Sequence, residues 1–154
     1  MRLDLRDERL KPDPISRSPF ARDLGFELLQ HEAGKAVVAV TLIDRLKNLR
    51  GVAHGGLTST LLDMAMGIAV RSPAGEWTPE GTVTLNIHFM LPGQGRLVAE
   101  GRLLKAGNSV AFAEGEVRNE QGVMVAKGTA TFKIVRRSPA PKQMDSDGDG
   151  SGQS

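Results

Sequence analysis

Two features near the middle of the 154-residue chain combine residue types and spacing that suit chemistry. The first is His54-Gly55-Gly56, which stands directly before a long apolar window. Backbone N–H groups at the start of a helix lack intrahelical acceptors, and small residues let a ligand approach them closely. The triplet is therefore a candidate site for a negatively charged group, although glycines that only allow a tight turn would give the same pattern.

The second feature is Asp63, an ionisable residue inside the apolar window Leu57–Val70. Aspartate is a poor residue for a helix interior and is almost never fully buried without a partner. One interpretation is that Asp63 lies on a solvated side of the helix or pairs with a lysine. The other is that a carboxylate in an apolar cleft acts as a general base or a nucleophile.

The spacing of the two features limits how they can cooperate. Gly55 and Asp63 are eight residues apart, which is roughly 12 Å along a helix axis at about 1.5 Å per residue. An aspartate side chain cannot span that distance. If both residues act on one group, they must come from two antiparallel helices, and a twofold homodimer supplies that arrangement. Provided that both are functional, the spacing predicts a composite site at a dimer interface.

The elements that must position these residues are one helix and several strands. Leu57–Val70 is apolar around nearly its whole circumference, so we expect a buried helix. Thr82–Leu91 alternates apolar and polar residues, which is typical of a strand with one buried face. The other expected elements are a short helix or turn at Pro19–Leu24 and strands at Lys35–Ile43, Arg96–Leu104, Ser109–Arg118 and Val123–Val135. This order favours an α+β fold with one buried helix and four final strands in an antiparallel meander.

Composition is ordinary for a folded protein and excludes several functions. Hydrophobic residues make up 40% and charged residues 25%, and the formal net charge is +2. Basic and acidic residues are interleaved and aromatics are 4%, so no nucleic-acid-binding groove or stacking platform is expected. The chain has no cysteine, and His31, His54 and His88 lack zinc-ligand spacing, so no metal site is expected.

The ends of the chain differ in composition from its centre. Residues 1–18 are highly charged and contain Pro12 and Pro14, which predicts a flexible N-terminal segment. Residues 136–154 are rich in Gly, Pro and Ser and predict a disordered C-terminal tail, because such a composition cannot bury a core. Residues 19–135 then form the single domain. No signal peptide or membrane-spanning stretch is recognisable, so a cytoplasmic protein without membrane contact is expected.

The two features belong to a longer motif, Asn48-x-x-Gly51-x-x-His54-Gly55-Gly56 followed by Leu61-Leu62-Asp63. This motif resembles the signature of the hotdog-fold acyl-CoA thioesterases of the PaaI-like (phenylacetate-pathway, THEM-like) branch, and the resemblance covers residues 19–135. It implies the hotdog fold, in which a curved antiparallel sheet of about five to six strands wraps one long buried helix. It also implies hydrolysis of a small aromatic, arylacetyl or medium-chain acyl-CoA by a homodimer, often paired into a tetramer. No cofactor is implied, because coenzyme A is part of the substrate.

The resemblance implies a role for each residue at a matching position. The Gly55 N–H would bind the oxygen of the thioester carbonyl, and Asn48 would donate a second hydrogen bond or orient the acyl group. Asp63 of the opposite subunit would activate water as a general base or attack the thioester directly. Thr82 would position the water or the carboxylate, or be an ordinary strand residue. His54 would shape the turn and hydrogen-bond near the thioester, with direct proton transfer as an alternative.

The resemblance also indicates where coenzyme A would bind. The residues expected to hold the phosphopantetheine and its phosphates are Phe89, Met90, Leu91 and Pro92, with Lys105, Asn108 and Ser109 in a following turn. Trp77 would line the acyl pocket or only pack. The competing hypothesis is a non-catalytic hotdog module that binds acyl-CoA as a sensor or scaffold. Such a module has no need of the Asp63 carboxylate.

Overall fold

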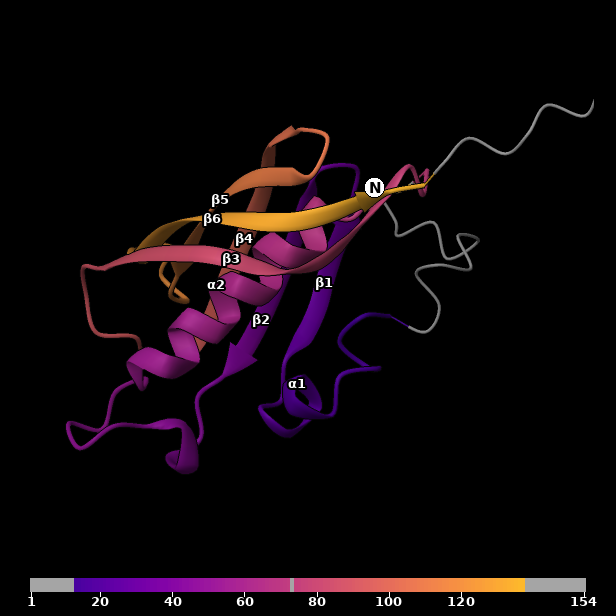
Figure 1. The fold of residues 1–154 in the computed structure, drawn as a ribbon. Coiled ribbons are helices and arrows are strands. Elements are labelled where there is room, and N and C mark those ends of the chain that lie inside the picture. The colour runs from indigo at the N-terminus through magenta and orange to yellow at the C-terminus, as the bar shows by residue number, and fades with distance from the viewer. Residues whose placement is uncertain (1–12, 73, 138–154) are drawn as a thin grey trace, which may run out of the picture.

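The computed structural model describes residues 13–72 and 74–137, in which an antiparallel sheet curves around one long helix (Figure 1). The helices are α1 (Pro19–Asp23) and α2 (Gly55–Val70), with a short 3-10 helix at Asp44–Leu46. The strands are β1 (Glu27–Glu32), β2 (Lys35–Thr41), β3 (Trp77–Phe89), β4 (Arg96–Ala106), β5 (Val110–Arg118) and β6 (Met124–Arg136). They form one six-stranded sheet in the order β1-β2-β4-β5-β6-β3. The predicted α+β class is confirmed.

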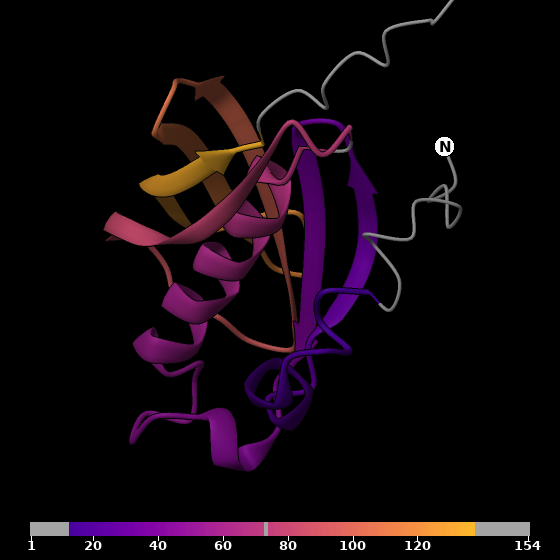
Figure 2. The ribbon, with the colours of Figure 1, turned by 45° about the vertical axis from the view of Figure 1, so that its right-hand side comes forward.

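Helix α2 lies against the concave face of the sheet (Figure 2). Its residues Leu61, Leu62 and Met66 have no solvent-exposed surface, which confirms the buried helix predicted at Leu57–Val70. The apolar residues cover most of the helix circumference because β2, β4 and β5 contact it on several sides. Asp63 lies on the half-buried remainder of that circumference.

A row of glycines lets α2 approach the sheet closely. Gly101 on β4 lies opposite Gly115 on β5, which in turn lies opposite Gly128 on β6. A Cβ atom on Gly101 would lie 2.4 Å from the backbone oxygen of Ala65 in α2, far inside the normal contact distance. A larger residue would force the helix away from the sheet. The depth of α2, and with it the position of Asp63, therefore depends on these glycines.

The structure contains a strand before the first one predicted. β1 covers the sequence ELLQHE, which has no β-branched residue and only weak alternation, so its composition did not indicate a strand. It pairs with β2 through a two-residue turn that ends at Gly34, whose φ of 74° lies in the left-handed region. The strand predicted at Lys35–Ile43 is thus the second in the chain.

The prediction of a four-strand meander after the helix is wrong. β3 pairs with β6 instead of β4, and only β4, β5 and β6 follow one another in the sheet. The connection after β3 is bonded to the end of β2 and to the loop before α2, because the Leu42 N–H donates to the Gly95 carbonyl (2.8 Å) and the Ala53 N–H to the Gly93 carbonyl (2.9 Å). These bonds place β4 beside β2 and leave β3 at the edge of the sheet.

β3 forms one edge of the sheet and is exposed along most of its 13 residues. In the described part of the chain, β6 is its one neighbouring strand. Val83, in the middle of β3, is 59% exposed, and Phe89, at its end, is 56% exposed. A long edge strand with exposed apolar side chains is a template for pairing with another chain.

The packed part of the chain begins before the predicted boundary at residue 19. Ile15 is buried in the core, and its N–H donates to the Asp13 carboxylate at 2.7 Å. Of the C-terminal tail predicted at 136–154, Arg136 is the last residue of β6, and the Arg137 N–H donates to the Glu76 carbonyl (2.9 Å). The remainder of the two predicted segments, residues 1–12 and 138–154, lies outside the described residues. Among the described residues, no helix has both the length and the apolar character needed to span a bilayer.

Candidate active site

The start of α2 carries one backbone donor that the fold leaves free. The Gly56 N–H donates to Nδ1 of His54 (2.9 Å), and the N–H groups of Leu57 and Thr58 donate to the His54 carbonyl (2.9 and 3.3 Å). Within the described residues, the Gly55 N–H has no acceptor. Because it lies at the positive end of a 16-residue helix, this donor is suited to bind an oxygen that carries negative charge.

His54 is the N-cap residue of α2. Since its Nδ1 accepts a hydrogen bond, the neutral imidazole carries its proton on Nε2. The ring therefore fixes the first turn of the helix and can donate one further hydrogen bond outward. Direct proton transfer by His54 stays a prediction.

Asn48 organises the loop that precedes α2. Its amide oxygen accepts hydrogen bonds from the N–H groups of Arg50 (2.9 Å) and Val52 (3.4 Å), and its own N–H donates to the Val52 carbonyl (2.8 Å). The side-chain oxygen is thus used within the loop. The Nδ2 group is the part of the side chain that can donate to a ligand.

A cavity of about 430 Å³ brings the first group of predicted residues together. Asn48 and Gly55 line it from the loop and the helix, and the residues that line it from the end of β3 are Phe89, Met90, Leu91 and Pro92. The Phe89 ring covers Gly55, since a Cβ built on that glycine would lie 3.7 Å from the ring. The predicted oxyanion donors and the predicted phosphopantetheine residues therefore share one cavity.

Asp63 lies in a second cavity, of about 220 Å³. Its Oδ1 accepts a hydrogen bond of 2.7 Å from the Thr82 hydroxyl of β3, and both residues line the cavity. Asp63 forms no ion pair with any of the described residues. The interpretation that Asp63 pairs with a lysine is therefore wrong for this part of the chain. The Thr82 hydroxyl donates to the carboxylate, and a role of Thr82 in the reaction stays a prediction.

Asp63 differs in this respect from the carboxylates on the outer face of the sheet. Glu100 forms ion pairs with Lys35 (3.2 Å) and with Arg102. Burial raises the pKa of Glu100, but the hydrogen bonds and charges of the two cations outweigh it and leave that pKa below its usual range. Glu100 is thus paired with two cations, whereas Asp63 has no ion-pair partner among the described residues.

The two cavities have no lining residue in common. The Asn48–Gly55 group lies at the first turn of α2, and Asp63 lies eight residues further along the same helix, roughly 12 Å away. Within one subunit, the described residues thus form two half-sites instead of one complete site.

The structure does not bring the predicted phosphate-binding turn to the larger cavity. Lys105, Asn108 and Ser109 lie in or beside the turn between β4 and β5. β5 begins opposite Lys133 of β6, whereas Phe89 lies opposite Ala126. Seven residues of β6, roughly 23 Å at about 3.3 Å per residue, separate the two places.

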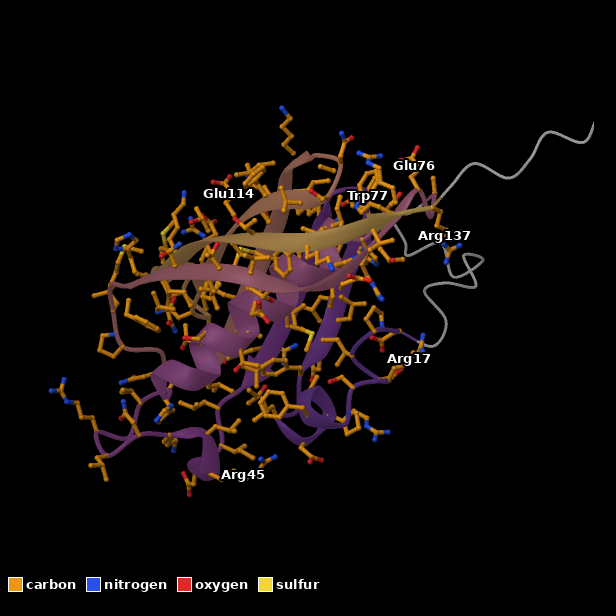
Figure 3. All side chains as sticks on the ribbon, viewed as in Figure 1. Arg17, Arg45, Glu76, Trp77, Glu114 and Arg137 are labelled. Carbon is orange, nitrogen blue, oxygen red and sulfur yellow. The ribbon has the colours of Figure 1, made fainter. Side chains whose placement is uncertain are left out.

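Trp77 packs at that far end of the sheet and is not among the residues of the smaller cavity. Its Nε1 donates to the Val70 carbonyl (2.8 Å), and the Arg136 guanidinium stacks on its ring at 5.1 Å. Arg136 also donates to the Gly107 carbonyl (3.0 and 2.8 Å), which ties the β4–β5 turn to β6. Figure 3 shows Trp77 beside Glu76 and Arg137, where β3 begins and β6 ends.

Sequence reasoning missed Arg71, which lines the smaller cavity together with Asp63. Arg71 directly follows α2, and its side chain is half-buried. Burial lowers its pKa, and the nearby charge of Arg17 lowers it further. The available signal was a charged residue directly after the apolar last two turns of α2. The described residues contain no group of three or more His, Asp or Glu that could hold a metal ion.

Comparison with known proteins places this geometry in a family. Residues 50–126 match the family model described as the thioesterase superfamily. The medium/long-chain acyl-CoA thioesterase YigI of Salmonella typhimurium is 32% identical, over 78% of this chain and 88% of that protein. Human acyl-coenzyme A thioesterase 13 is 30% identical, over 73% of this chain and 82% of its own length.

Solved structures agree with this assignment. A variant of the phenylacetic acid degradation protein PaaI from Thermus thermophilus is 28% identical and superposes with a TM-score of 0.68, over 75% of this chain and 98% of that one. The helix enclosed by a curved six-stranded sheet is therefore the hotdog fold that the motif predicts. The chain belongs to the thioesterase superfamily, as a PaaI-like hotdog protein.

Proposed function

We propose that the protein is an acyl-CoA thioesterase whose active site forms between two subunits. The observation that carries this proposal is the division of α2 into two half-sites, a free Gly55 N–H at its start and an Asp63 carboxylate held by Thr82 further along. Acyl transfer to water needs both an oxyanion donor and a base or nucleophile close to one carbonyl group. The relatives that are named acyl-CoA thioesterases support the substrate class.

The exposed edge of β3 supports a twofold dimer as the source of the second half-site. If two copies pair antiparallel through β3, with Val83 near the twofold axis, Phe89 of one subunit lies opposite Trp77 of the other. The larger cavity of one subunit then lies beside the smaller cavity of its partner. The exposed apolar residues that such a dimer would cover include Leu49, Val83, Phe89 and Leu91.

In this dimer, the residues act on the thioester as follows. The Gly55 N–H and Asn48 Nδ2 of one subunit donate to the carbonyl oxygen and stabilise its negative charge as the tetrahedral intermediate forms. Asp63 of the partner subunit takes a proton from water, whose oxygen bonds to the carbonyl carbon. The C–S bond then breaks, and the proton passes to the thiolate, which leaves as coenzyme A. Direct attack by Asp63 would instead give a mixed anhydride that water cleaves to the same products.

The dimer also brings the predicted coenzyme A residues together. The larger cavity would hold the pantetheine beside Phe89–Pro92 of one subunit. The β4–β5 turn of the partner subunit, with Lys105, Asn108 and Ser109, would then lie on the same side and bind phosphate. The smaller cavity would then hold the acyl group, and its volume suits a medium-chain or small aromatic acyl group. The dimer is proposed to pair further into a tetramer in the cytoplasm.

A thiol-release assay with a panel of acyl-CoAs tests the proposal. The panel contains straight-chain esters from four to sixteen carbons together with phenylacetyl-CoA and benzoyl-CoA, and each is also tested for binding by calorimetry. We expect turnover of medium-chain or arylacetyl esters by the wild-type protein. Binding of these esters without any thiol release would contradict the proposal and identify a non-catalytic acyl-CoA-binding module.

A further inference from the structure

Arg71 places an unpaired cation at one end of the smaller cavity. Its guanidinium forms no ion pair and no hydrogen bond with any of the described residues. Glu80, which lines the same cavity, is occupied by Lys133 at 3.0 Å. A half-buried arginine without a counter-ion is unusual, because burial of a charge costs free energy unless a partner compensates it.

A second cation makes this end of the cavity more positive. Arg17 lies close enough that its charge, together with burial, lowers the pKa of Arg71. Figure 3 shows Arg17 on the side of the molecule away from the start of α2. A cation after a helix also interacts favourably with the helix carbonyls, but the Arg71 side chain donates to none of them in the described part. An anion at this point would relieve the repulsion between the two arginines.

The part of the cavity wall that α2 and β6 form between Asp63 and Arg71 is apolar. Met64, Gly67 and Ile68 line the cavity along α2, and Phe132 closes it from β6. Asp63 and Arg71 are eight residues apart, which is roughly 12 Å along the helix axis. An extended chain covers about 3.6 Å with every three bonds, so about ten bonds span this distance. The cavity therefore has a reactive carboxylate at one end, an apolar middle and a cation at the other end.

Resting on the proposed function, we infer that the enzyme selects acyl-CoA esters with a second carboxylate at the far end of the acyl chain. Such a substrate is the mono-CoA ester of a dicarboxylic acid of about eight to ten carbons. Its methylenes lie against Met64 and Phe132, and its terminal carboxylate receives two hydrogen bonds from the Arg71 guanidinium. The bond that breaks and the products formed at the thioester are those of the proposed reaction.

Three esters that differ only at the far end of the chain test this inference. They are octanedioyl-CoA, its terminal methyl ester and octanoyl-CoA, and kcat/KM is measured for each. We expect kcat/KM of the wild-type enzyme to be about 10- to 100-fold higher for octanedioyl-CoA. This ratio corresponds to the free energy that a hydrogen bond to a charged group contributes. In Arg71→Gln this preference should vanish because kcat/KM falls far more for octanedioyl-CoA than for octanoyl-CoA, and Arg71→Lys should retain part of the preference.

Arg22→Gln, an exposed arginine change on α1, is the matched control and should leave all three rates unchanged. A wild-type enzyme without preference for octanedioyl-CoA would overturn the inference while leaving the thioesterase proposal intact. An equal rise of KM for all three esters in Arg71→Gln would also overturn it, because Arg71 would then bind a coenzyme A phosphate. If no ester were hydrolysed, the proposed function would fail, and calorimetric affinities for octanedioyl-CoA and octanoyl-CoA would decide the inference separately.

Discussion

The two ends of α2 contribute different kinds of groups to the two cavities. At its start, the Gly55 N–H and the Asn48 loop offer hydrogen-bond donors that come from the path of the backbone. Further along, Asp63 and Arg71 offer charged side chains whose surroundings come from β3 and β6. The first end is built by local turns and the second by packing between distant segments. The following changes separate the two contributions.

The largest effect on activity is expected from a change of Asp63. Asp63→Asn keeps the size of the residue and an oxygen that can accept from Thr82, but it removes the base or nucleophile. We expect kcat to fall by about 10²- to 10⁴-fold, with coenzyme A affinity and thermal stability nearly unchanged. Steady-state kinetics and calorimetry measure this, with the exposed Asp23→Asn as the control. A variant that kept most of its turnover would remove Asp63 from the chemistry.

A nearly equal effect is expected at the backbone end, where proline can delete one N–H. Gly55 is the first residue of α2, a position that tolerates proline, and His54 has the extended conformation (φ −60°, ψ 136°) that a following proline requires. Gly55→Pro should lower kcat by about 10²- to 10³-fold. Gly55→Ala retains the N–H, and its Cβ would lie 3.7 Å from Phe89, so it should stay close to wild type. Equal rates for the two variants would show that this N–H does not bind the oxyanion.

Both ends depend equally on the depth of α2 in the sheet. Gly101→Ala would place a Cβ atom 2.4 Å from the Ala65 carbonyl oxygen. We expect a loss of about 3 kcal/mol or more in the free energy of unfolding, and a Tm lower by about 10 °C. Gly81→Ala, where the added Cβ meets nothing within 4 Å, is the control in thermal and urea unfolding. Equal Tm values for both variants would argue against the close contact of α2 with β4.

The smallest effect is expected from the C-terminal segment. Its composition predicts no buried surface, so deletion of residues 140–154 should change neither end of α2. The Tm and kcat/KM of the shortened protein should match those of the full chain. A drop of several degrees in Tm would show that this segment packs against the domain.

The features that could be predicted from the sequence are those that local segments determine. The start of α2 could be predicted because His54-Gly55-Gly56 is a local signal, and the buried helix could be predicted from the apolar window around Asp63. The spacing of Gly55 and Asp63 already predicted that the two residues, if both are functional, belong to separate half-sites. These features depend on neighbours in the sequence and on helix geometry alone.

The remainder depends on contacts between distant segments and was missed for that reason. β1 has no strand-forming composition and exists because β2 offers it a partner. β3 pairs with β6, a strand far away in the sequence, while the Leu42–Gly95 hydrogen bond lies where β2 ends and β4 is about to begin. Arg71 shares a cavity with Asp63 because β3 and β6 enclose that side of α2. No periodicity along the chain encodes such contacts.

The shared site is tested most directly by mixing two inactive variants. Asp63→Asn and Asn48→Ala are first prepared separately, and each homodimer should be strongly impaired. On co-expression, random pairing makes about half of the dimers mixed. In a mixed dimer, the intact Asn48 of one chain meets the intact Asp63 of the other, so about a quarter of all sites should recover wild-type turnover. No gain over the average of the two parents, with mixed dimers verified by mass, would contradict a site built from two subunits.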